Sequence, residues 1–386
     1  MALRSQKHVF NLPDDVTYFN TASLSPSFKS VEAAGIEAVI NKSHPYKIPS
    51  SDFFDPVTEL RKRFAKLIDC NDYQRVVTSP SVSYGMANVA NNIKLQKGDE
   101  ILVIEEQFPS NVYTWRKLAQ RYDAKLVTIK KPAVKTNCGQ QWNEAILKAI
   151  TKNTAVVALG HIHWSNGIIF NLKAIRQKTL KHNALLIVDG SQSIGVMPFS
   201  IENLQPDALL CAGYKWLFGP YGCAYAYYGP KFDNGAPIEE NWSNRLNSEN
   251  LVGLTNYQDL YKPLANRYAV GENGSFIYVK MQLAALNEVL KYNPKDIQDY
   301  CRSISEKAIH KFREMGCSVF DAGERANHLF GIELPENIDV DLLQKKLKEQ
   351  KIYVSFRGKY MRISCYLFNT ENDFDKLVKA MEATFK

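Results

Sequence analysis

The chain has 386 residues, of which 45% are hydrophobic and 23% are charged, and its formal net charge is +8. This composition is typical of a soluble globular protein with two or three domains. No apolar run reaches about 18 residues, which argues against a membrane-spanning helix, and the dispersed basic residues argue against a nucleic-acid-binding patch.

The seven cysteines lie far apart in the sequence and form no CxxC pair. This spacing argues against a zinc ribbon or a disulfide framework, and it favours reduced thiols in a cytoplasm. The first 15 residues, MALRSQKHVFNLPDD, lack the hydrophobic core of a signal peptide. We therefore expect a cytoplasmic protein without a bound metal.

Short apolar runs alternate with helical stretches between residues 75 and 190. This alternation predicts parallel strands that are connected by crossover helices. The predicted strands cover residues 75–78, 101–106, 125–131, 154–160 and 184–190, and the predicted helices cover 84–93, 110–122, 141–150 and 172–183.

The pattern changes after residue 206. Residues 208–213 and 222–229 read as two strands, and the loop between them is too short for a crossover helix, so we expect them to pair antiparallel. Residues 231–274 are polar and irregular. Two helices, at 276–292 and about 296–315, and an α+β unit complete the chain. We predict a large three-layer α/β/α domain with a mostly parallel sheet at residues 15–260, and a smaller α+β domain at residues 261–386 that residues 1–14 join.

Ligands of open α/β sheets bind beyond the carboxyl ends of the strands, and five of the predicted strands are followed by polar or aromatic side chains. Each of these features alone is weak evidence, because a carboxylate after a strand is common and a serine-rich turn is often only a helix N-cap. The residues at or just after the ends of the five strands are Ser81 to Ser83, Phe108, Trp164, Asp189, and Tyr214 with Lys215.

Together these residues match the chemical needs of pyridoxal 5'-phosphate. Its ring nitrogen requires a carboxylate, for which Asp189 is the candidate. Its phosphate suits the hydroxyl and N–H groups of Ser81 and Ser83 at a helix N-terminus. Phe108 provides a flat partner for the ring, and Lys215 provides the amine for a Schiff base with the aldehyde.

Two segments carry a family resemblance. LLIVDGSQSIG (185–195) and DALLCAGYKWLFGPYG (207–222) resemble the aspartate and lysine motifs of the class V aminotransferase family, in fold type I of the pyridoxal phosphate enzymes. That family includes cysteine desulfurases, selenocysteine lyases, kynureninases and isopenicillin N epimerase-like proteins. The resemblance extends from residue 18 to residue 370. It implies the PLP-transferase fold and a homodimer with its active site at the interface.

The resemblance also implies roles for the cofactor-binding residues. Asp189 pairs with the ring nitrogen, Gln192 donates to the phenolic oxygen, and Lys215 carries the cofactor and moves the proton at Cα. The remaining assignments are Ser81, Val82 and Ser83 at the phosphate, Tyr214 in the place of a phosphate-binding histidine, Phe108 in the place of a ring-stacking histidine, and Trp164 in the place of an asparagine near the cofactor oxygen.

Other matching positions concern the substrate and the partner subunit. By resemblance, Arg362 binds the substrate α-carboxylate, and Arg357 matches a second arginine found in part of the family; the alternative for each is a salt bridge on a strand surface. Asn20 and Ala22 match a segment that lines the substrate pocket. Ser275, in GENGSF (271–276), is a candidate for the partner's phosphate site, or else an N-cap of the following helix.

The reaction type is the open question. The segment KIYVSFRGKYMRIS (351–364) has no cysteine where the desulfurases carry their nucleophile, and Cys365 reads as a small buried hydrophobe. We expect an aminotransferase that acts on an α-amino acid. A lyase that cleaves C–S or C–Se bonds, or an epimerase, is the alternative within the family. A non-catalytic cofactor-binding sensor is a remote alternative, and a nucleotide-binding protein is disfavoured because no GxGxxG or GxxxxGK[ST] motif is present.

Overall fold

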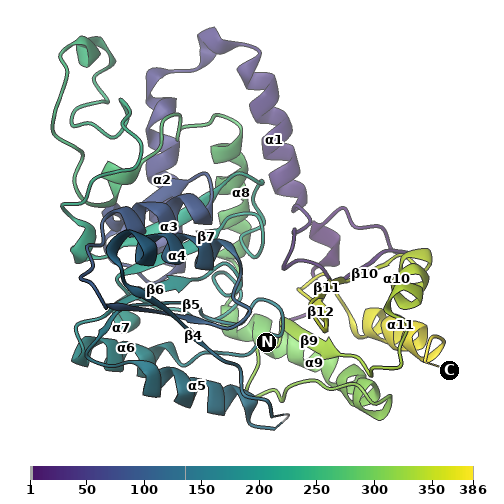
Figure 1. Cartoon of the computed structure of the whole chain (residues 1–386). Coiled ribbons are helices and arrows are strands. Elements are labelled where there is room, and N and C mark those ends of the chain that lie inside the picture. The colour runs from purple at the N-terminus through teal and green to yellow at the C-terminus, as the bar shows by residue number, and fades with distance from the viewer. Residues whose placement is uncertain (1–2, 135, 386) are drawn as a thin grey trace.

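The computed structural model describes residues 3–134 and 136–385 of the chain. A seven-stranded sheet with the order β2-β8-β7-β6-β5-β3-β4 forms its centre (Figure 1). Strand β8 runs antiparallel to both of its neighbours, as predicted for the pair β7–β8, and the other strands share one direction. The strands are β2 (Val76–Ser79), β3 (Glu100–Ile104), β4 (Lys125–Ile129), β5 (Thr154–Gly160), β6 (Leu185–Asp189), β7 (Ala208–Ala212) and β8 (Ala224–Tyr228).

The sheet is buried on both faces because successive residues of its strands point to opposite sides. In β6, for example, Leu186 and Val188 join one hydrophobic cluster and Ile187 joins the other. Helices α3 (Val82–Asn91) and α4 (Ser110–Tyr122) contribute to the cluster of Ile187. The opposite cluster is covered by α2 (Asp55–Leu67), α5 (Cys138–Ala149), α6 (Leu172–Lys181) and α8 (Tyr278–Val289). The expected three-layer α/β/α architecture is therefore confirmed.

A second, smaller sheet lies in the C-terminal part of the chain. Its order is β11-β12-β9, with antiparallel neighbours, and helix α11 packs against α9 and α10 beside it. The short strand β1 (Thr17–Tyr18) pairs with β10 (Ile352–Tyr353), so the N-terminal segment lies against this unit. The elements are β9 (Leu329–Glu333), β11 (Ser355–Arg357), β12 (Tyr360–Ser364), α9 (Pro294–Glu314), α10 (Val340–Glu349) and α11 (Glu371–Glu382).

Helix α1 (Lys29–Lys42) extends beside α2 and packs against α8 (Figure 1). Helix α8 falls on the C-terminal side of the predicted boundary at residue 260, yet it packs against α1 and α2; the division into residues 15–260 and 261–386 stays a prediction. The short helix α7 (Ile201–Leu204) precedes β7. Within residues 3–134 and 136–385, no helix has both the length and the apolar character needed to cross a membrane.

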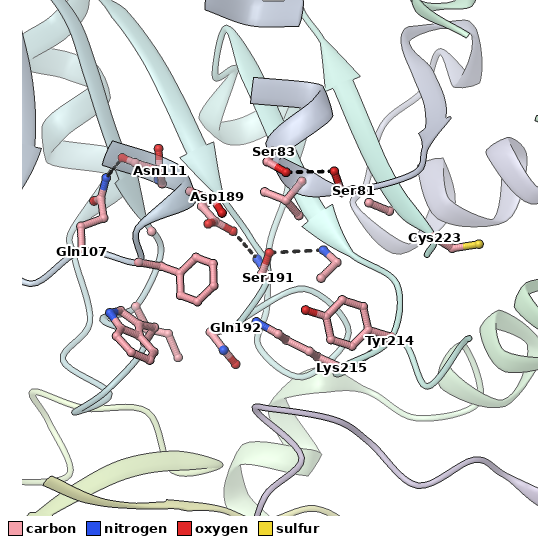
Figure 2. A pocket seen from close by; sticks show the side chains of 18 of the residues that line it. Ser81, Ser83, Gln107, Asn111, Asp189, Ser191, Gln192, Tyr214, Lys215 and Cys223 are labelled. Carbon is pink, nitrogen blue, oxygen red and sulfur yellow. Dashed lines mark hydrogen bonds between the residues drawn. The ribbon is translucent and has the colours of Figure 1, made fainter. Parts of the chain in front are cut away.

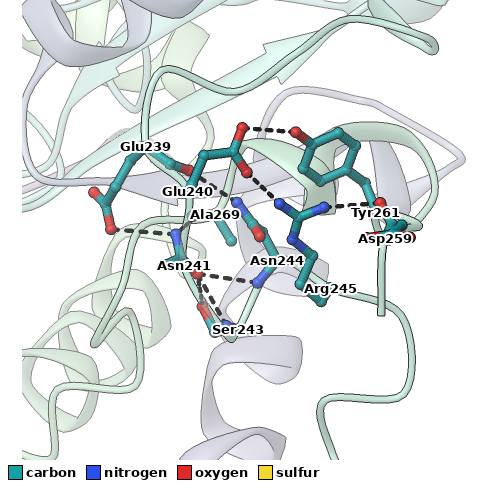
Figure 3. A network of polar contacts seen from close by, with 9 residues as sticks. All are labelled: Glu239, Glu240, Asn241, Ser243, Asn244, Arg245, Asp259, Tyr261 and Ala269. Carbon is teal, nitrogen blue, oxygen red and sulfur yellow. Dashed lines mark hydrogen bonds and ion pairs between the residues drawn. The ribbon is translucent and has the colours of Figure 1, made fainter. Parts of the chain in front are cut away.

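Residues 231–274 contain short 3-10 turns and one isolated β-bridge, between Arg245 and Tyr261. Residues 246–260 project from the body as an arm (Figure 1). A polar network closes the base of the arm (Figure 3). The guanidinium carbon of Arg245 lies 4.3 Å from the ring centroid of Tyr261, and Arg245 donates a hydrogen bond of 2.8 Å to the backbone oxygen of Asp259. Glu240 accepts hydrogen bonds from both Arg245 and Tyr261. The arm is therefore held by polar contacts at its base, while its tip faces outward.

Candidate functional site

A cavity of about 200 Å³ opens beyond the carboxyl ends of the central strands (Figure 2). We call it the strand-end cavity. It lies where parallel strands of an open α/β sheet bring their carboxyl ends to one edge. Its lining includes, among the predicted residues, Ser81, Val82, Ser83, Phe108, Trp164, Asp189, Gln192, Tyr214 and Lys215.

Lys215 follows β7 and is only 7% exposed. Its Nζ lies 5.3 Å from the ring centroid of Phe108 and 5.7 Å from that of Tyr214. It has no hydrogen-bond or ion-pair partner among the residues the structure describes. Burial lowers the pKa of Lys215 to about 8, and the nearby Asp189 opposes that shift. Part of the amine is therefore neutral near neutral pH, which is the form that attacks a carbonyl.

Asp189 ends β6 and faces the same cavity (Figure 2). One of its carboxylate oxygens accepts a hydrogen bond from the backbone N–H of Ser191 at 3.0 Å. Asp189 and Lys215 do not form an ion pair with each other, and no ion pair to Asp189 occurs within the described part of the chain. The cavity therefore presents an anion and a buried amine that are free to contact a ligand between them.

The N-terminus of α3 forms a third wall of the cavity. Ser81 is its N-cap, and the Ser81 Oγ accepts from the Tyr84 N–H at 3.1 Å and lies 3.0 Å from the Ser83 Oγ (Figure 2). The other N–H groups of the first turn have no partner within the helix. Together with the hydroxyl groups and the helix dipole, they make this turn suitable for a phosphate.

Two aromatic side chains form the outer wall of the cavity. The rings of Phe108 and Trp164 meet edge to face, with their centroids 5.4 Å apart. Trp164 is fixed by a hydrogen bond of 2.7 Å from its indole N–H to the backbone oxygen of Glu106. This wall limits the access of water and gives a flat ligand an apolar surface.

Gln192 connects the cavity to the N-terminal segment. Its Nε2 donates to the backbone oxygen of Ala22 at 3.0 Å, and its Oε1 accepts from the indole N–H of Trp216 at 2.8 Å. One amide hydrogen of Gln192 remains for a ligand. The Ala22 N–H donates to Ser364 Oγ at 3.0 Å, and the buried Oδ1 of Asn20 has no partner. The structure therefore brings Asn20 and Ala22 next to β12 and to this side of the cavity.

Arg362 and Arg357 lie beyond Trp164 on the hairpin β11–β12. Arg362 is 1% exposed, and it donates from Nε to Ser355 at 3.1 Å and from Nη1 to the Trp164 backbone oxygen at 3.0 Å. Burial, and then the charge of Arg357, lower the pKa of Arg362 to about 9. Both arginines donate to Ser23 Oγ. Ser23 is absent from the sequence-based candidates, although it stands directly after the predicted Ala22.

Ser275 lies outside the strand-end cavity. It lines a second cavity with Phe53 and Trp242, and its Oγ accepts from the Tyr278 N–H at 3.3 Å at the start of α8. The contact has the spacing of an N-cap bond, but α8 begins at Tyr278 and its N-cap position is Ile277, without a side-chain cap. Within one subunit, Ser275 and the residues around Lys215 are therefore not brought together.

The described thiols near the cavity are buried or have a raised pKa. Cys223 lines the cavity, and burial raises its pKa to about 11; burial also raises the pKa of Cys211 well above its ordinary value. Cys365 is completely buried. A reactive cysteine has a lowered pKa and an accessible sulfur, so none of these three is placed to form a persulfide.

Several lining residues were not identified from the sequence. Gln107 and Asn111 are buried side by side, and the Oε1 of the first and the Nδ2 of the second lack hydrogen-bond partners (Figure 2). Buried polar atoms without a partner are rare in folded proteins, so they suggest a polar ligand in this cavity. The position of Gln107 and Asn111 shortly after β3 was the feature of the sequence that could have identified them. His163 also lines the cavity, and burial lowers its pKa to about 4.

Comparisons with known proteins agree on the family. The model of the Aminotransferase class-V family matches residues 38–377. An uncharacterized aminotransferase, YcbU, of Bacillus subtilis is 23% identical over 336 residues, which cover 84% of this chain and 82% of the relative. A probable cysteine desulfurase of Halalkalibacterium halodurans is 27% identical over 324 residues, 79% of this chain and 74% of the relative.

A solved structure confirms the fold. A mutant of C-DES with glycine covalently linked to its pyridoxal phosphate cofactor superimposes with a TM-score of 0.86 and 18% identity, and the match covers 97% of this chain and 98% of that one. The central sheet and the C-terminal unit therefore have the architecture that the sequence predicts.

Proposed function

The chain belongs to the class V aminotransferase family of pyridoxal phosphate enzymes, and from this premise we propose that it transfers the amino group of an α-amino acid to a keto acid. The observation that carries this proposal is the pair formed by Lys215 and Asp189. A buried amine with a pKa of about 8 faces the same cavity as a carboxylate, and neither forms an ion pair with another described residue.

The residues of the strand-end cavity fit the cofactor. The unpaired carboxylate of Asp189 suits a protonated ring nitrogen, and the first turn of α3 suits a phosphate. The partnerless polar atoms of Gln107 and Asn111 would face a polar ligand instead of an empty space. When bound, pyridoxal phosphate supplies an aldehyde for the substrate amine and a ring that withdraws electrons from Cα.

The protein side chains would then bind, orient and move protons. Arg362 would hold the α-carboxylate through its planar fork. Lys215, once neutral, would accept the proton from Cα and return it elsewhere, and its lowered pKa suits that task. Phe108 and Trp164 would keep water from the reacting atoms. None of these steps requires a nucleophilic thiol. The raised pKa of Cys223, which makes it a poor nucleophile, is consistent with this.

The alternative is a β-eliminating lyase or an epimerase. The probable cysteine desulfurase among the relatives supports chemistry at a sulfur-bearing carbon, and these reactions also begin with the loss of the Cα proton. They differ in where the proton returns and in what leaves the substrate. The products therefore decide between the two candidates.

The test is a single-turnover experiment on the holoenzyme with a panel of amino acids and no amino acceptor. We expect one amino acid to yield one keto acid per bound cofactor, with no ammonia. The variant Lys215→Ala should yield none. Ammonia, sulfide or an inverted amino acid as the product would replace the aminotransferase with a lyase or an epimerase.

We also propose that the enzyme is a homodimer. Helix α1 exposes Ile36, Val39 and Ile40, and the tip of the arm exposes Val252 and Tyr257, each 93% accessible. Apolar groups gathered on a surface commonly mark an interface. A second copy that covers α1 and the arm would bury them. In that arrangement Ser275, at the second cavity, would be available to the partner's phosphate site.

The oligomeric state tests this assembly. Sedimentation equilibrium should give a dimer, and a variant with Ile36→Glu and Ile40→Glu should raise its dissociation constant by at least tenfold. Leu180→Glu on α6, which makes the same change at another exposed position, is the control. A monomer with full cofactor occupancy would contradict the proposal. The seven free thiols support a reducing, cytoplasmic compartment.

A further inference from the structure

Two arginine side chains converge beside the strand-end cavity. In the hairpin β11–β12, Ser355 stands opposite Arg362 and Arg357 stands opposite Tyr360, so both guanidinium groups project from the same face. The Nη2 atoms of Arg362 and Arg357 lie 2.6 Å and 3.2 Å from the Oγ of Ser23. Both groups also lie over the ring of Trp164, at 5.8 Å and 6.0 Å from its centroid. Two positive charges thus meet at one hydroxyl oxygen.

Among the described residues, no carboxylate pairs with these two charges. Neither Arg357 nor Arg362 forms an ion pair with an acidic side chain in the described part of the chain. Arg362 is almost completely buried. A buried charge without a counter-charge is costly, and two like charges in contact add to the cost. An occupied site would therefore hold negative charge that the protein itself does not supply.

The free hydrogen-bond donors indicate how much negative charge fits. Arg362 uses three of its N–H groups on Ser355, Trp164 and Ser23, which leaves one on each Nη, the pair that binds a carboxylate end-on. Arg357 uses two, on the Phe356 oxygen and on Ser23. It keeps its Nε–H and one N–H on each Nη, and the Ser23 hydroxyl hydrogen is also free. One carboxylate offers about four lone-pair sites, fewer than these donors require.

We propose that the substrate is an α-amino acid with a second oxyanion, a carboxylate or a sulfinate, on a short side chain. Arg362 binds the α-carboxylate, while Arg357 and the hydroxyl of Ser23 bind the side-chain oxyanion. The side chain is short because the two guanidinium groups meet at a single oxygen atom. This inference rests on the proposed function, in which an α-amino acid binds at Arg362.

Analogues that lack the amino group test this inference without turnover. Isothermal titration calorimetry of the holoenzyme would compare succinate with butyrate, which has the same carbon chain and one carboxylate less. We expect succinate to bind at least tenfold more tightly. The variant Arg357→Gln should bind succinate about tenfold more weakly than the wild type does, and its affinity for butyrate should change by less than twofold. The variant Arg362→Gln should bind both ligands more weakly.

Three controls keep the result interpretable. Lys359→Gln removes a charge from the same hairpin, where Lys359 pairs with Glu333, and it should change neither affinity. Arg357→Lys keeps the charge without the fork and should retain part of the preference for succinate. Thermal unfolding and cofactor absorbance of each variant would show that the fold and the cofactor site persist.

The outcomes separate this inference from the proposed function. Equal affinities for succinate and butyrate, or an Arg357→Gln variant that weakens both equally, would mean that both arginines share one carboxylate, and the inference would be wrong. In single turnover, aspartate, glutamate or cysteine sulfinate should form keto acid faster than alanine or serine, and comparing them distinguishes a carboxylate from a sulfinate. If alanine forms keto acid as fast as the acidic amino acids do, the inference about the substrate is wrong, but the proposed aminotransferase function stands. If no amino acid forms keto acid, the proposed function is wrong, and the inference that rests on it is lost too.

Discussion

The substitution Lys215→Met tests the electrostatic character of the site. Methionine keeps an unbranched side chain of similar length in the same buried position but carries no charge. In the folded protein, burial lowers the pKa of Lys215 from 10.5 to about 8. In the unfolded chain, the amine has its ordinary pKa. Below pH 8, folding must therefore bury a charged amine or remove its proton, and both are unfavourable.

The pKa shift sets the size of the effect. Each pKa unit corresponds to about 1.4 kcal/mol, so the lysine destabilises the cofactor-free fold by about 3 kcal/mol at pH 7. Between pH 8 and pH 10.5 the unfolded chain binds more protons than the folded one, so the stability of the wild type rises with pH. At pH 9.5 the penalty falls to about 1.5 kcal/mol, and well above the unfolded pKa it disappears.

Urea unfolding of the cofactor-free protein, followed by circular dichroism at pH 7 and pH 9.5, measures this difference. We expect the Lys215→Met variant to be more stable than the wild type at pH 7, and its advantage to shrink by about 2 kcal/mol at pH 9.5. Lys117→Met, at an exposed position on α4, is the control for the loss of a lysine outside the cavity. An advantage for Lys215→Met that is the same at both pH values would refute a lowered pKa of Lys215.

Three further substitutions have outcomes that follow from the structure. Gly167→Ala should lower the free energy of unfolding by about 3 kcal/mol or more, because Gly167 has φ +82 and a Cβ there would lie 2.1 Å from the Leu329 oxygen; a near-neutral result in thermal unfolding would contradict this. Asp207→Asn should lower the free energy of unfolding by about 3 kcal/mol, because it removes the negative charge that lies 2.8 Å from the largely buried Arg176. A decrease of less than about 1 kcal/mol in urea unfolding would mean that this ion pair contributes little to stability. Asp189→Asn should weaken pyridoxal phosphate binding by about tenfold or more, as expected for a lost charged hydrogen bond, and an unchanged dissociation constant by absorbance titration would remove Asp189 from the site.

The strand order of the central sheet was only partly predictable. The runs at β5 and β6 are continuous apolar segments, as expected for parallel strands covered on both faces, so their positions followed from the sequence. The insertion of β8 between β2 and β7 did not, because it depends on pairing between segments far apart in the chain. Local patterns carry no information about such pairing.

The two helices before residue 70 were not predicted from the sequence, for two different reasons. Helix α2 buries Val57, Leu60 and Phe64 at helical spacing, so its signal was present but was not used. Helix α1 buries Val31 and Ala38, yet it exposes Ile36 and other apolar side chains. Without a single apolar stripe, periodicity does not identify a helix of this kind.

The site shows the same division between local and long-range information. Lys215 and Asp189 could be chosen as candidates because Asp189 ends β6 and Lys215 comes shortly after β7, and both strands are recognisable in the sequence. Ser23 could not, because its contacts are with Arg357 and Arg362, more than 300 residues away in the chain. The resemblance to a known family suggested a substrate-binding role for Arg362, but the shared hydroxyl between the arginines becomes visible only in three dimensions.

The most direct test of the account is to locate the lysine that carries the cofactor. The purified protein would be incubated with pyridoxal phosphate, reduced with borohydride and digested, and the modified peptide would be identified by mass spectrometry. We expect one stable modification per chain, on Lys215, and none at this position in Lys215→Ala. Attachment to a different lysine, or no attachment at all, would contradict the assignment of this cavity as the active site.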